Sequence, residues 1–177
     1  VNKDVVQHIH QASTYQKEAL LLKVLSEIST QPRMLAPKEV SVIVFLNKKS
    51  ACDATARRLK QEGWNSMSLH GGKSQDDRLR ILKAFTTGRV QVIVATDVAS
   101  RGLDIKGVSH VINYDLPMGG VEDWVHRVGR TGRAGASGIA HTFLSDHDAP
   151  SAAHLIKVME EAKQEIPSFL RDMAGRA

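Results

Sequence analysis

Residues 74–96, SQDDRLRILKAFTTGRVQVIVAT, contain a predicted helix followed directly by a predicted strand. Ser74, with Asp77 three residues later, resembles a capping box, so we expect a helix to begin there and to end at Gly88. Residues 91–96 are almost wholly apolar, which is typical of a strand buried on both faces. The buried stripe of the helix is predicted from three apolar residues at helical spacing: Leu79, Leu82 and Phe85.

The same alternation of helix and strand continues on both sides of this stretch. In the helix expected at 50–62, Ala51, Ala54 and Leu59 are predicted to face inward, and Gly63 is predicted to end it. Apolar strands that alternate with helices favour an α/β fold with a mainly parallel sheet and helices on both faces. The other predicted strands are residues 5–10, 40–46, 67–70, 108–114 and 139–144, and the other predicted helices are residues 16–28, 121–128, 149–163 and 168–174.

Length and composition restrict the classes of protein. The 177 residues suit a single domain spanning residues 1–177. The one cysteine, Cys52, can form neither an internal disulfide nor a zinc cluster, so we expect a reducing, intracellular compartment, nucleus or cytoplasm. A net charge of +5 is compatible with a polyanionic partner. No apolar run approaches the about 20 residues of a membrane span, and we expect a monomer without membrane contact.

The first candidate motif is Gly72-Lys73-Ser74, which follows a strand and opens a helix as the end of a P-loop does. A P-loop requires G-x-x-x-x-G-K-[ST], and Met67 occupies the position of the first glycine. We therefore reject a P-loop here. Two interpretations stay open, a tight turn with a surface lysine, or a turn whose Gly71 and Gly72 backbone binds a phosphodiester.

The second motif, TDVASRGLD at residues 96–104, comes directly after a buried strand. Asp97 could imitate a magnesium-binding carboxylate, but without a P-loop there is no metal-bound phosphate for it to meet, so we expect no metal site. A structural interpretation makes Asp97 a helix N-cap and Gly102 part of a turn. A functional one rests on the density of polar groups, including Arg101, at the carboxyl end of a strand.

The third motif, HRVGRTGRAG at residues 126–135, places three arginines among glycines that leave their charges unshielded. Guanidinium groups bind phosphate oxygens bidentately and stay charged at physiological pH. The motif therefore predicts a polyanion site, with a solvated basic loop as the alternative. His126 taken alone is expected to be a polar relay at most.

These motifs together resemble the C-terminal motifs of the DEAD-box RNA helicases, in the order and spacing of that family. The resemblance rests on VIVF at 42–45, LHG at 69–71, QDDR at 75–78, ATDVASRGLD at 95–104 and HRVGRTGR at 126–133. It covers nearly the whole chain. The amino acids at residues 52–53, 63–64 and 73–75 are similar to those of the p68-like branch of the family.

The resemblance implies a three-layer RecA-like domain, the second of two domains that grip ATP and RNA between them. Arg130 and Arg133 are implied as arginine fingers to the γ-phosphate. Asp104, with Gly102 beside it, would meet the ribose, and His126 would link to an acidic motif of the partner domain.

The resemblance also implies contacts to the RNA sugar-phosphate chain, made by Gly71, Arg78, Thr96 and Arg101. Arg127 would brace the site from within. One departure is Gly72, which stands where the family commonly has Asp and which affects the expected RNA contact of that turn.

A P-loop and an Asp-Glu-Ala-Asp segment are absent from this sequence. The resemblance therefore implies that ATP with Mg²⁺ is held mainly by an N-terminal domain, and that this domain alone is inactive. Two alternatives stay open, a catalytically silent RNA-binding or regulatory module, and a DNA-directed helicase of the same superfamily.

Overall fold

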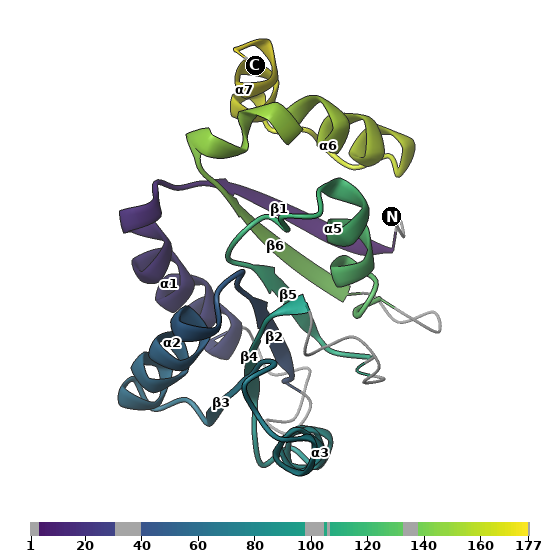
Figure 1. Cartoon of the computed structure of the whole chain (residues 1–177). Helices are drawn as coiled ribbons and strands as arrows, with labels where there is room; N and C mark the ends of the chain where they lie inside the picture. The colour runs from purple at the N-terminus through teal and green to yellow at the C-terminus, as the bar shows by residue number, and fades with distance from the viewer. Residues whose placement is uncertain (1–3, 31–39, 98–104, 106, 133–137, 177) are drawn as a thin grey trace.

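The computed structural model describes residues 4–30, 40–97, 105, 107–132 and 138–176. Within these ranges six strands form one sheet in which every neighbouring pair is parallel, in the order β1-β6-β5-β2-β4-β3 (Figure 1). The predicted α/β fold with a mainly parallel sheet is confirmed. The strands are β1 (Val5–Gln11), β2 (Val42–Phe45), β3 (Ser66–Leu69), β4 (Val92–Ala95), β5 (His110–Asn113) and β6 (Gly138–Leu144).

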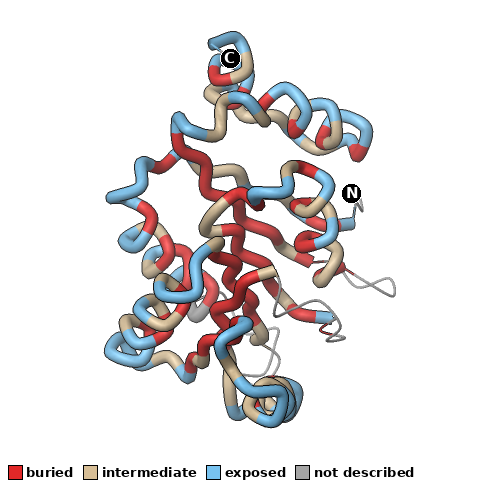
Figure 2. The backbone as a smooth tube through the Cα atoms, in the orientation of Figure 1, coloured by how far each residue is buried: buried red, intermediate tan, exposed pale blue. Residues whose placement is uncertain are grey.

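Helices cover both faces of the sheet, as predicted. On one face α1 and α2 pack over Val44 and Phe143, and on the other α3, α5, α6 and α7 pack in the cluster that contains Ile43 and Val111. Figure 2 shows the buried strands between helices whose outer sides are exposed. The helices are α1 (Lys17–Thr30), α2 (Lys49–Gln61), α3 (Gln75–Thr86), α5 (Val121–Val128), α6 (Ala149–Glu161) and α7 (Ser168–Gly175).

Short 3-10 turns at Thr14–Gln16 and Asp146–Asp148 precede α1 and α6. In the part of the chain that the structure describes, none of the helices has the length and the apolar character that a membrane crossing requires.

The central strands are buried at every residue because helices cover both of their faces. The predicted start of α3 is confirmed, since the Ser74 hydroxyl accepts a hydrogen bond from the Asp77 backbone N–H at 3.1 Å. The predicted ends of α2 and α3 are confirmed by positive φ angles of 92° at Gly63 and 82° at Gly88. Local residue chemistry therefore sets these boundaries.

The predicted inward faces of α2 and α3 are partly wrong. Ala54 is exposed, and the buried stripe of α2 consists of Cys52, Ala56 and Leu59. Leu79 is 49% exposed, and the buried residues of α3 are Ile81 and Phe85. Both helices carry apolar residues on more than one face, so packing against the sheet decides which stripe is buried.

Four histidines gather on the face of the sheet that α1 covers: His8, His10, His110 and His141. The His10 Nε2 and His141 Nδ1 atoms are 2.9 Å apart, and the His8 and His141 rings stack with centroids 4.8 Å apart. Burial, with the neighbouring His8 as a smaller cause, lowers the pKa of His141 to about 3 and that of His110 to about 4.

These lowered pKa values predict that the free energy of unfolding decreases as the pH falls from 7 toward 4.5. The unfolded chain binds protons at these histidines near pH 6.5 and the folded chain does not, so acid favours unfolding. We expect a loss of about 1 kcal/mol per pH unit for each histidine, measured by urea unfolding at pH 7, 6 and 5. His141→Gln should flatten this dependence and the exposed His154→Gln should not; equal slopes in both variants would contradict the explanation.

Candidate nucleotide and RNA site

The polar residues that follow the parallel strands lie along one edge of the sheet, which we call the carboxyl edge. It consists of Asn47 after β2, His70 and Gly71 after β3, Thr96 and Asp97 after β4, and Asp115 after β5. Because β5, β2, β4 and β3 are neighbours in this order, these residues form one continuous row. Ligands of parallel α/β sheets bind at this edge.

Arg127 of α5 holds three of these strand ends together. Its side chain is 2% exposed, and it donates from Nε and Nη2 to the two carboxylate oxygens of Asp97, both at 2.7 Å. Nη1 donates to the backbone oxygen of Asp115 at 2.6 Å, and Nη2 donates to Asn47 Oδ1 at 3.2 Å. The guanidinium also lies 4.9 Å from the centre of the Phe45 ring. The expectation that Arg127 braces the site from within is confirmed.

A second ion pair extends this network to α1. Lys17 is buried, and its ammonium group lies 3.1 Å from Asp115 Oδ1. The other oxygen of Asp115 accepts the backbone N–H of Asn47 at 3.0 Å. The ends of β2 and β5 and the start of α1 are therefore tied to the same carboxylate.

Arg130 lies at the end of α5, and both polar groups of its backbone are paired. Its N–H donates to the Arg127 oxygen and its own oxygen accepts from Val108 N–H, both at 3.1 Å. Its guanidinium Nη1 donates to the backbone oxygen of Ile105 at 3.3 Å. The buried Thr131 hydroxyl donates to the Val108 oxygen at 2.5 Å. These contacts place Arg130 beside the segment that leads into β5.

Gly132 adds a contact with β1 to those that Arg130 and Thr131 make with the segment before β5. Its φ is +71°, and a Cβ atom at this position would lie 2.5 Å from Val5 Cγ2 of β1. A side chain is therefore excluded both by backbone conformation and by space. The glycine that sequence analysis read as leaving the arginines unshielded thus has a second role in packing the motif against the sheet.

Two of the residues predicted to contact RNA, Gly71 and Thr96, belong to the carboxyl edge, where β3 and β4 end. Thr96 follows β4, and its backbone N–H donates to the Leu69 oxygen at 3.2 Å, which places it beside the end of β3 and Gly71. Arg78 is in the first turns of α3. Among the described residues, Thr96 Oγ1 and Arg78 Nε are buried atoms that lack a hydrogen-bond partner. Buried polar atoms are usually paired, so these two are candidates for a ligand.

His126 is exposed on α5, next to the buried Arg127. Four of the predicted site residues lie outside the described residues: Arg101, Gly102, Asp104 and Arg133. The helix that Asp97 was predicted to begin falls on residues 98–104, which also lie outside the described residues. The described residues contain no group of three or more His, Cys, Asp or Glu side chains that could hold a metal ion.

Comparison with known proteins identifies the family. Residues 17–135 match the helicase conserved C-terminal domain. The ATP-dependent RNA helicase-like protein DB10 of Nicotiana sylvestris is 46% identical over 99% of this chain. The chain belongs to the DEAD-box helicases. This DEAD-box domain spans 27% of the length of DB10.

Solved structures agree with this assignment. The DEAD-box splicing factor Prp28 of yeast has a TM-score of 0.83 at 30% identity, over 98% of this chain and 37% of that chain. The E. coli DEAD-box protein SrmB, in a complex with regulator of ribonuclease activity A, has a TM-score of 0.74 at 34% identity, over 93% and 98%. The predicted RecA-like fold of this DEAD-box domain is confirmed. Its similarity to the p68-like branch stays a prediction.

Sequence analysis missed two members of the site of this DEAD-box domain, Asn47 and Lys17. Asn47 comes directly after the apolar run of residues 40–46, so its place at a strand's carboxyl end was available as a signal. Lys17 gave no signal, because its contact with Asp115 joins residues that are 98 positions apart.

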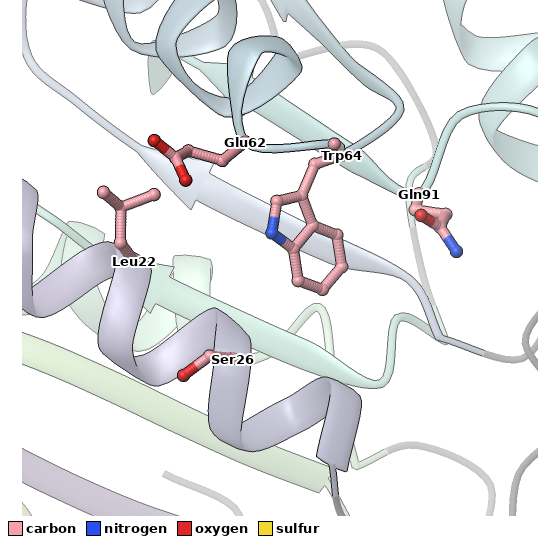
Figure 3. Close-up of a pocket in the computed structure, with 6 residues that line it drawn as sticks. Leu22, Ser26, Glu62, Trp64 and Gln91 are labelled. Atoms are coloured by element: carbon pink, nitrogen blue, oxygen red, sulfur yellow. The ribbon is translucent and has the colours of Figure 1, made fainter.

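The site of this DEAD-box domain does not coincide with a hollow of about 430 Å³ at the other edge of the sheet. Figure 3 shows this hollow between the end of α2 and α1, with Trp64, Glu62 and Leu22 around it. Gln91 lines the hollow and directly precedes β4, so the hollow lies where the strands begin, opposite the carboxyl edge. None of the predicted site residues that the structure describes lines it.

Proposed function

We propose that this chain is one half of an ATP-dependent RNA helicase whose other half is an N-terminal RecA-like domain of the same protein. In this proposal Arg130 and Arg133 reach the γ-phosphate as arginine fingers. Asp104, with Gly102, meets the ribose, and His126 contacts the N-terminal domain. The observation that carries the proposal is the anchoring of Arg130. Its backbone is bonded to Arg127 and Val108, and its guanidinium donates to the backbone oxygen of Ile105, the neighbour of Asp104.

RNA would bind where β3 and β4 end, through Gly71, Arg78, Thr96 and Arg101. The unpaired Thr96 hydroxyl and Arg78 Nε support this, since a phosphate or ribose oxygen could pair with each. The net charge of +5 is compatible with a polyanionic ligand. Contacts of this kind hold the RNA backbone without reading its bases, so binding would tolerate many sequences.

The division between two domains would make closure the step that controls hydrolysis. Magnesium would be held mainly by the N-terminal domain with the triphosphate. An arginine finger raises the hydrolysis rate by roughly 10³- to 10⁵-fold against a bound triphosphate and has no effect without one.

The test is the RNA-stimulated ATPase activity of this chain alone and of the chain joined to the N-terminal domain of its protein. We expect turnover in the joined protein only. ATP turnover by this chain alone would contradict the proposal. The absence of turnover in both samples would favour the RNA-binding or regulatory module. Stimulation by DNA but not by RNA would favour the DNA-directed helicase.

Arg78→Ala is expected to weaken RNA binding and to reduce its dependence on salt. If Arg78 contacts one phosphate, its removal should lower the slope of log affinity against log salt by about 0.7, the value for one contact to a single strand. The control is Arg80→Ala on the same helix, whose guanidinium is exposed and already paired with Asp77. Fluorescence anisotropy across a salt series measures both variants, and identical slopes would rule out the Arg78 contact.

A further inference from the structure

A partly buried hydrogen-bond relay connects α2 to the turn after β3. Asp53 of α2 has a half-exposed carboxylate whose Oδ1 accepts the Ser68 hydroxyl at 2.5 Å. His70 Nε2 lies 3.0 and 3.1 Å from the two oxygens of the same carboxylate. The hydrogen bond from Ser68, and to a smaller extent that from His70, lowers the pKa of Asp53. This carboxylate therefore stays charged at neutral pH and acts only as an acceptor.

The partners of His70 define its tautomer. The Gly72 backbone N–H donates to His70 Nδ1 at 3.0 Å, so Nδ1 is unprotonated. The ring proton is then on Nε2, where it is donated to Asp53. The ring is buried, and its two nitrogens are both used, so it is held in one orientation by the helix on one side and the turn on the other.

This arrangement leaves one backbone donor of the turn available. The Lys73 N–H donates to the His70 oxygen at 3.1 Å, and the Gly72 N–H donates to the His70 ring. Among the residues that the structure describes, nothing accepts a hydrogen bond from the N–H of Gly71, which is exposed. A phosphate oxygen at the carboxyl edge could accept it.

Gly72 makes the turn depend on His70. Glycine has no side chain with which to stabilise the turn, and a Cβ at this position would lie only 3.0 Å from His70 Cε1. The Gly72 backbone therefore lies close against the His70 ring, with little room for a side chain between them. The imidazole is therefore one of the groups that order the turn, together with the His70 backbone oxygen that accepts from Lys73.

We propose that Asp53 and His70 are positioning residues for RNA binding: Asp53 orients His70, and His70 orients the turn so that the Gly71 N–H is presented to the RNA backbone. This rests on the proposed function, because it assumes that Gly71 contacts RNA. Neither side chain touches the RNA in this proposal.

The test uses the sign of an electrostatic effect. Asp53→Ala in the full-length protein removes a negative charge near a polyanion, and charge alone would strengthen RNA binding. Positioning predicts the opposite, an about tenfold rise in the RNA concentration that half-saturates the ATPase, with the maximal rate unchanged. The matched control is Asp76→Asn, an exposed carboxylate in the first turn of α3, which should leave that concentration unchanged or lower it.

An unchanged or lower RNA requirement in Asp53→Ala overturns the positioning role, as does a loss of maximal rate alone. A second measurement does not depend on this variant folding. Nitrogen-15 NMR of the wild-type chain should show the Nε2–H tautomer of His70 and a shift of the Gly71 amide on addition of an oligouridine strand. The Nδ1–H tautomer overturns the positioning role whatever the ATPase shows. If the wild-type protein has no RNA-stimulated turnover while the Nε2–H tautomer is present, it is the proposed function that fails.

Discussion

The Arg130→Ala variant of the two-domain protein is expected to lose RNA-stimulated ATP turnover by about 10³-fold or more. The guanidinium would neutralise charge that develops on the transferring phosphoryl group, and alanine cannot do so. The folded state should survive, since the hydrogen bonds that join Arg130 to Arg127 and Val108 come from its backbone, which alanine keeps. Single-turnover hydrolysis with saturating ATP and RNA measures the loss at the chemical step.

Two comparisons separate this effect from general damage. Arg89→Ala removes an exposed arginine near Trp64, away from the site, and should leave turnover unchanged. Thermal unfolding of the isolated chain should give nearly the same midpoint for Arg130→Ala and the wild type. The finger assignment fails if Arg130→Ala and Arg133→Ala both hydrolyse ATP at near-normal rates.

The Arg127→Ala variant is expected to lose about 3–5 kcal/mol of unfolding free energy, the cost of removing one partner from a buried ion pair. Arg127 is 2% exposed, and its removal would leave Asp97 and the Asp115 backbone oxygen without their shared donor. The ends of three neighbouring strands would lose their common tie. Urea unfolding monitored by circular dichroism measures the loss.

Arg171→Ala is the matched control for this prediction. Its ion pair with Glu160 is exposed on both sides, so its removal should cost at most about 1 kcal/mol. Arg127→Lys should fall between the two, because a lysine keeps the charge but cannot form the bidentate contact with Asp97. Equal losses in Arg127→Ala and Arg171→Ala would show that the buried network does not stabilise the fold.

Much of the fold was predictable because local sequence sets it. The apolar runs that became β2 and β4 are buried at every residue, and the helix at residues 121–128 has the predicted bounds. The inward faces of α2 and α3 were not predictable from their own sequences. Leu79 and Ile81 are equally apolar, and only the position of the helix against β3 determines that Ile81 is buried.

The motifs of the site were predictable from the sequence, but the contacts between their side chains were less so. The place of Asp97 after a strand followed from the pattern, whereas its pairing with Arg127 joins residues 30 positions apart and depends on the tertiary structure. Sequence analysis placed the polar chemistry at the carboxyl ends of the strands. The structure instead anchors Arg130 to Val108, which precedes β5, because the end of α5 returns toward that side of the sheet.

The pairing of β1 with β6 has a consequence for how the protein folds while it is being synthesised. His10 of β1 and His141 of β6 are bonded across the sheet although they are 131 residues apart in the chain. During synthesis β1 must therefore wait until residues 138–144 have been made before it finds its neighbour β6, and such distant pairings form slowly. Because Gly132 packs against Val5 of β1, the place of this glycine against the sheet also depends on that late pairing, and a nascent chain that stops before β6 would lack it.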